Sequence, residues 1–182
     1  MLRKIGQFRK ARSGLAAVEF ALIAPVMVTL LLGTVEICNA LECHQKVTML
    51  ASTGADLVAQ TTSVSSSDMN NIFSAVNAII YPFSTGDTKI VISSIVSDGN
   101  GGGTVAWSKA ENTTARTTDE AVTVPDGLMS KDECGKDECS VILAEVTYEY
   151  TSPIGSFFIG QVPMSDTFYT RPRRSATVEY TG

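Results

Sequence analysis

The feature that most constrains this chain is an apolar run, Leu15–Val35, that directly follows a short basic segment. As a helix the run would extend about 30 Å, which matches the thickness of the hydrocarbon core of a bilayer. Its only charged residue is Glu19. A charged side chain costs about 2–3 kcal/mol at the bilayer centre and less near the edge, so a plain anchor gains nothing from this carboxylate. The run therefore predicts a membrane-spanning helix in which Glu19 has a separate purpose.

The charge of the chain is unevenly distributed. Residues 1–14 hold five of the fourteen Lys and Arg residues and no acidic residue, which leaves nine basic and nineteen acidic residues in the rest. By the positive-inside rule the basic segment is the cytoplasmic flank of a single-pass membrane segment, and the rest of the chain lies on the far side of the membrane. Nucleic-acid binding requires a cationic surface, so the acidic body argues against it.

A helical pattern continues beyond the apolar run. One helix of about 45 residues, or two abutting helices, is expected from Leu15 to about Gln60, because apolar residues recur at three- and four-residue steps. We expect the apolar stripe to pack on the soluble domain and Glu36 to lie off it. Pro25 lies inside the helix and is expected to kink it, because proline removes a backbone hydrogen bond. The stripe comprises Ile37, Ala40, Leu41, His44, Val47, Ala51, Ala55 and Val58.

Residues 61–182 are expected to form a globular domain. Ser67 or Asp68 offers an N-cap for a second amphipathic helix, which ends before Pro82. After it the pattern alternates, as it does in strands. The expected strands are Lys89–Ser97, Thr104–Ala110 and Val141–Tyr150, with Thr167–Thr170 and Ala176–Tyr180 as closing strands. The fold class is therefore α+β: a long transmembrane helix continuing into a small periplasmic domain with a second helix and an antiparallel sheet.

The boundary between the basic segment and the apolar run has the form of a processing site. Gly14 ends the basic segment, and Glu19 and Phe20 follow after a spacer of four residues. A prepilin peptidase would cut after Gly14 and leave Leu15 with a charged α-amino group at the bilayer edge, where Glu19 of a neighbouring subunit can pair with it. The residues alone fit equally well an uncut anchor whose Glu19 reaches the membrane interface.

The segment RSGLAAVEFALIAPVMVTLLLGTVEI resembles the N-terminus of TadE-like pseudopilins, minor pilins of the tight-adherence (Tad) type IV pilus. The pattern consists of a basic leader, a glycine, Glu-Phe, a proline-containing apolar helix and a second acid near its end. It is met here by Gly14, Glu19, Phe20, Pro25 and Glu36, and the strong resemblance covers residues 9–60.

The resemblance implies a division into a leader (1–14), a transmembrane helix (15–35), its periplasmic extension (36–60) and a pilin-like domain (61–182). Gly14 and Leu15 would form the processing junction, and Glu19 would serve peptidase recognition or subunit docking. The implied partners are a prepilin peptidase, other major and minor pilins, the inner-membrane assembly platform and the lipid bilayer. The implied function is a pilin subunit that assembles into, or primes, an adhesive pilus outside the cell. The alternative is an uncleaved, membrane-anchored periplasmic scaffolding or sensory domain.

The cysteines lie outside that pattern. Cys134 and Cys139 bracket a polar loop, and in an oxidising periplasm we expect them to form a disulfide. Cys38 and Cys43 point about 140° apart on a helix, so a bridge between them is disfavoured and their state stays open.

No catalytic or cofactor site is expected. The only histidine, His44, is expected to pack on the apolar stripe. A metal site with Cys38 and Cys43 is disfavoured because zinc sites use shorter cysteine spacing. No nucleotide-binding or hydrolase motif is present. The basic cluster of Arg171, Arg173 and Arg174 fits either an acidic partner subunit or a solvated turn.

Overall fold

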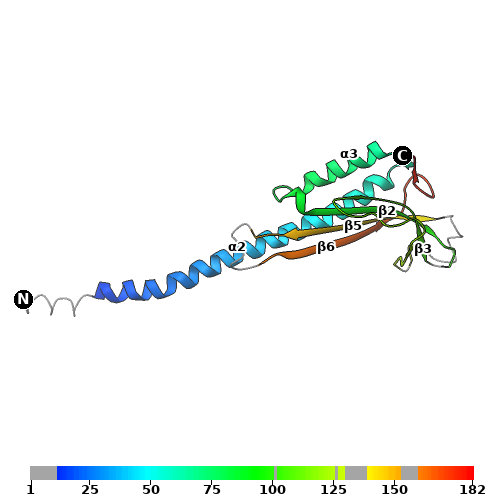
Figure 1. Ribbon diagram of the computed structural model, residues 1–182. Coiled ribbons are helices and arrows are strands. Elements are labelled where there is room, and N and C mark those ends of the chain that lie inside the picture. Colours follow the sequence, from blue (N-terminus) through cyan, green and yellow to red (C-terminus); the bar gives the residue numbers. More distant parts are fainter. Residues whose placement is uncertain (1–11, 101, 126, 130–138, 153–159) are drawn as a thin grey trace, which may run out of the picture.

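One helix, α2 (Arg12–Ala59), runs along the molecule in the computed structural model (Figure 1). The structure describes residues 12–100, 102–125, 127–129, 139–152 and 160–182. The helix is continuous over 48 residues, which confirms the single-helix alternative. Its N-terminal half extends away from the domain, and its C-terminal half lies along the sheet. Pro25 lies within α2, and the Thr29 hydroxyl donates to its carbonyl at 2.8 Å. The predicted kink stays a prediction.

A second helix, α3 (Ser66–Asn77), packs beside the C-terminal half of α2. Its N-cap is Ser65, and the expected Ser67 and Asp68 lie in the first turn instead. Ser65 is favoured because an aspartate follows three residues later and completes a capping box. The Asp68 amide donates to the Ser65 hydroxyl at 3.3 Å, and the Ser65 amide donates to the Asp68 carboxylate at 2.9 Å. Two short 3-10 turns follow, Ala78–Ile80 and Thr85–Asp87.

The domain is built on a five-stranded antiparallel sheet with the order β4-β3-β2-β5-β6. Its strands are β2 (Thr88–Ser97), β3 (Gly103–Glu111), β4 (Ala121–Val122), β5 (Ser140–Tyr150) and β6 (Val162–Thr170). The α+β fold class and the three central strands are confirmed.

The edges of the sheet differ from the expectation. Strand β4 was not predicted, because two residues carry no detectable alternation, and β6 begins earlier than the expected Thr167. The expected strand Ala176–Tyr180 reduces to β7 (Glu179–Tyr180), which pairs in parallel with β1 (Ser63–Val64) in a separate two-stranded sheet. The C-terminal segment thus holds the start of α3 against β3: Tyr180 bonds to Ser66, and the Trp107 indole donates to the Val178 carbonyl at 2.7 Å.

The two faces of the sheet bury different clusters. On β5, Ile142, Ala144, Val146, Tyr148 and Tyr150 join the core formed with α2 and α3, as the alternation predicts. The opposite face is apolar only toward one end. There Val141 and Leu143 pack with Ile95, Val105, Val122, Val124 and Met129.

The side of α2 that packs on the sheet coincides with the predicted stripe from Val47 onward, but not at Ile37, Leu41 and His44. Ile37 and Leu41 are more than half exposed and His44 is exposed, whereas Cys43 and Leu50 are fully buried. Of the predicted stripe, Val47, Ala51, Ala55 and Val58 are buried. The prediction was wrong in the first turns because the apolar face of the membrane-spanning half continues past residue 35 on the outer side of the helix.

Candidate assembly site on the N-terminal helix

The N-terminal half of α2 presents its apolar side chains outward. Between residues 14 and 35 none is buried, and Leu15, Phe20 and Leu31 are 64%, 72% and 63% exposed. Within the described residues this helix is the one that is long and apolar enough to cross a membrane. Such a surface is stable only in lipid or against other apolar helices.

The predicted processing and docking residues lie together on the first turns of this half. Gly14, Leu15, Glu19 and Phe20 are all exposed, and a side chain at Gly14 would meet only open space. Leu15 and Glu19 are four residues apart, so they lie on one face of the helix. No ion pair joins Glu19 to another residue in the part of the chain that the structure describes. The arrangement leaves this carboxylate accessible to a group outside the chain.

Glu36, the second acid of α2, has a different environment. It is 0% exposed, and its Oε1 accepts a hydrogen bond from the Tyr150 hydroxyl at 2.9 Å. Its Oε2 has no hydrogen-bond partner among the described residues. The expectation that Glu36 lies off the packed side was therefore wrong. The alternation of β5, which places Tyr150 on the buried face, was the signal that a polar partner was available.

Further polar contacts join α2 to β6 and to the segment after it. The Thr48 hydroxyl donates to the Asp166 carboxylate at 2.5 Å. Arg173 forms an ion pair with Asp56, and its amide donates to the Ala59 carbonyl at 2.8 Å. These contacts fix the C-terminal half of the helix on the domain.

Two of the three arginines in the predicted basic cluster bond within the chain. Arg173 contacts α2, and the Arg171 guanidinium donates to the carbonyls of Gly127 and Leu128. Arg174 is exposed. Arg171 and Arg173 therefore join separate segments of this chain to one another.

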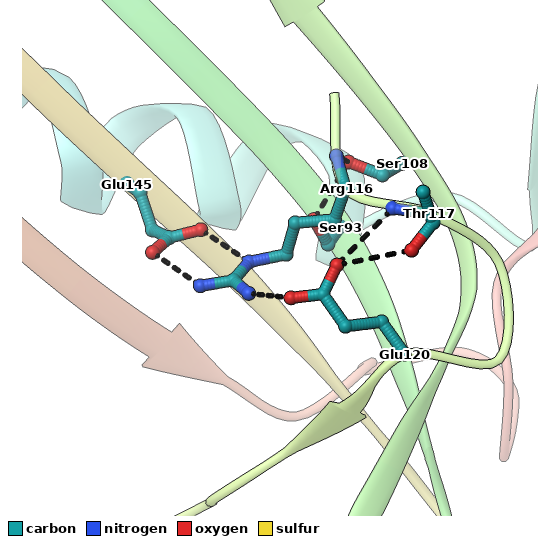
Figure 2. A network of polar contacts seen from close by, with 6 residues as sticks. All are labelled: Ser93, Ser108, Arg116, Thr117, Glu120 and Glu145. Carbon is teal, nitrogen blue, oxygen red and sulfur yellow. Dashed lines mark hydrogen bonds and ion pairs between the residues drawn. The ribbon is translucent and has the colours of Figure 1, made fainter. Parts of the chain in front are cut away.

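A polar network centred on Arg116 was not predicted from the sequence (Figure 2). The guanidinium donates two hydrogen bonds to Glu145, at 2.7 and 2.8 Å, and one to Glu120 at 2.5 Å. Its amide donates to Ser108, and Ser93 donates to the same hydroxyl. The hydrogen bonds that the guanidinium donates to Glu145 raise the pKa of Arg116 above its usual value. The network fastens the segment after β3 to the sheet.

Two of the four cysteines are free thiols in different surroundings. Cys38 is exposed, whereas Cys43 is buried and burial raises the pKa of its thiol to about 11. Cys134 lies outside the described residues, so the pairing with Cys139 stays a prediction. No cluster of metal-binding side chains, including any with His44, occurs within the described ranges.

The comparisons with known proteins concern α2. The model of the TadE-like protein family matches residues 14–56, from the glycine of the processing motif to the part of α2 that packs on the sheet. The match confirms the resemblance in that segment, and the family is a structural component of the pilus, not an enzyme family. No curated protein and no solved structure matches the chain.

Proposed function

We propose that this chain is a minor pilin of a Tad-type type IV pilus, cleaved after Gly14 and assembled through the exposed half of α2. The proposal rests on two boundaries that fall at the same residue. The family match begins at Gly14, where the basic leader ends and the apolar half of α2 begins. A prepilin peptidase acting there removes residues 1–14 and leaves Leu15 as the new N-terminus.

In this proposal Glu19 is the docking group. The new α-amino group and a carboxylate are both costly to bury in an apolar assembly, and pairing them offsets part of that cost. Glu19 lies one helical turn from Leu15 and is free to pair with the amine of an adjacent subunit. The pair would exist only in the correct axial register, so it selects that register.

The apolar surface of residues 15–35 then moves from lipid into a bundle of pilin helices. It exchanges one apolar environment for another, so the register is determined by polar groups and side-chain packing. The domain built on α3 and the sheet is bulky beside a single helix, which favours a position at the tip or base of the fibre over a repeated position in a thin shaft. The subunit would prime or cap the pilus that adheres to surfaces.

The topology follows from the charge distribution. Residues 1–14 stay in the cytoplasm, residues 15–35 span the inner membrane, and residues 36–182 lie in the periplasm until the subunit enters the fibre. In that compartment Cys134 and Cys139 would form the predicted disulfide. The partners are the prepilin peptidase, other major and minor pilins and the inner-membrane assembly platform.

The replacement Glu19→Gln tests the docking role. It keeps the size of the side chain and removes its charge, so we expect at least about a tenfold loss of the subunit from sheared pili, corresponding to about 1.4 kcal/mol. Glu42→Gln is the matched control, because Glu42 is an exposed acid on the same helix with a 3.9 Å surface pair to Lys46. Equal incorporation of the Glu19→Gln variant and the wild type would remove the docking role.

The competing proposal is an uncleaved anchor that carries a periplasmic scaffolding or sensory domain. The observation in its favour is that Glu19 lies near the end of the span, where an unpaired carboxylate can reach water. The two proposals differ in the N-terminus of the protein in cells.

A further inference from the structure

From Gly14 onward, the first buried residue of α2 is a carboxylate, Glu36. From Gly14 to Val35 every side chain is exposed or partly exposed, and Glu36 is 0% exposed. This residue therefore marks the point where the free half of the helix joins the domain. Among the hydrogen bonds and ion pairs that join α2 to the other described residues, the bond of Glu36 is the one nearest the free half.

That contact is polar on a helix face that is otherwise apolar. The Tyr150 hydroxyl donates to Glu36 Oε1 at 2.9 Å, and both residues are fully buried. Tyr150 is itself held in place: it ends β5, pairs with Val162 of β6, and meets the edge of the Phe83 ring at a centroid distance of 6.0 Å. The pKa of Tyr150 is raised mainly by burial and, to a smaller extent, by the hydrogen bond to Glu36. The hydroxyl therefore keeps the proton that it donates.

Stability alone does not account for this choice of residues. Glu36 Oε2 is buried without a hydrogen-bond partner among the described residues, and a group of that kind costs about 1–3 kcal/mol. A leucine at this position would bury apolar surface without that penalty. An apolar contact tolerates sliding and rotation, whereas a hydrogen bond has a preferred length and direction. The pair therefore provides directional control at a cost in stability.

We propose that Glu36 and Tyr150 are a positioning pair that determines the direction in which the apolar half of α2 leaves the domain. The inference rests on the proposed function, in which that half must align with other helices. Glu36 lies 21 residues from Leu15, or about 32 Å along the helix at 1.5 Å per residue. A change of about 10° at the joint would move the cleaved end sideways by about 6 Å and would misplace Glu19.

The test is a distance distribution measured by electron paramagnetic resonance on the full chain in detergent micelles. Spin labels are attached to cysteines introduced at Leu22 on the free half and at Ser165 on β6, both exposed. The background carries Cys38→Ser, and Cys43 is buried. We expect one narrow distribution for the wild-type joint, because a single hydrogen-bonded arrangement holds the two segments.

Three variants of the joint separate positioning from packing. Glu36→Gln keeps an acceptor for the Tyr150 hydroxyl and should retain the narrow distribution, whereas Glu36→Leu and Tyr150→Phe remove one partner and should broaden or shift it by several ångströms. The control is Val47→Ala, a fully buried position on α2 without a polar contact. It should lower the melting temperature and leave the distribution narrow.

The inference is overturned if Glu36→Leu and Tyr150→Phe give the wild-type distribution, or if Val47→Ala broadens it equally. Tyr150→Phe removes a single oxygen atom, so it keeps the test informative if Glu36→Leu fails to fold. Because the distance is measured in the isolated protein, the result does not depend on pilus assembly. Failure of the proposed function would appear in the pilus fraction instead.

Discussion

The side of α2 that packs on the sheet can be tested with Cys38 and Cys43, which are free thiols in the described part of the chain. Cys38 and Cys43 are five residues apart on one helix, and the structure exposes the first and buries the second. The apolar stripe expected from the sequence would have turned Ile37, Leu41 and His44 inward instead. Alkylation by N-ethylmaleimide, a small neutral reagent, therefore reports which side of α2 faces the domain.

The expected difference in rate follows from the thiol of Cys43. Burial raises its pKa from 9.0 to about 11. Near pH 8, a rise of about two pKa units makes the thiolate fraction about a hundredfold smaller. The thiolate is the reactive form, and its full burial adds the need for local opening. We expect Cys43 to react at least about 100-fold more slowly than Cys38.

The assay is a time course of peptide masses in detergent without reductant, which leaves any disulfide intact. In guanidinium chloride the two thiols should react at similar rates, because unfolding removes the difference in environment. Labelling of Cys43 at the rate of Cys38 in the folded protein would refute the observed helix orientation and, with it, the burial of Glu36.

The remaining predictions concern stability. Arg116→Met should lower the free energy of unfolding by about 1–3 kcal/mol, measured by thermal denaturation, because it leaves two carboxylates side by side without their cation. Lys89→Met, which removes an exposed pair to Glu149, should cost less than about 0.5 kcal/mol, and equal losses would contradict the structural role of Arg116. Stability should also depend on pH, because the folded state binds the Cys43 proton more tightly than the unfolded chain does. Stability from this residue is therefore complete below pH 9.0 and is lost as the pH rises toward about 11, a loss that Cys43→Ala should abolish.

The parts of the fold that the sequence predicted are those with a strong local period. Strand β5 alternates cleanly between Ile142 and Tyr150, so its bounds and its buried face followed from the pattern. The single helix α2 followed from a long apolar run that continues into a helical period. The turn Ser65–Asp68 carries an equally local signal, although the N-cap was assigned two or three residues too late.

The parts that the sequence did not predict depend on contacts between distant segments. Glu36 meets Tyr150 across 114 residues, and Arg116 meets Glu145 across 29, so neither partner is visible in a local pattern. The outer stripe of Ile37 and Leu41 was assigned inward because an apolar period does not say which of two apolar sides of a helix meets the domain. The candidate site at Gly14, Leu15, Glu19 and Phe20 could be proposed from the sequence because its signal is local: one short motif at the boundary of a charged and an apolar segment.

The central claim is that the leader is removed after Gly14 to create the subunit that assembles. Mass spectrometry of the protein isolated from the membranes and pili of its own cells measures the N-terminus directly. The account predicts a chain that begins at Leu15. A protein that retains Met1 or any other part of residues 1–14 in both fractions would contradict it and would favour the uncleaved anchor.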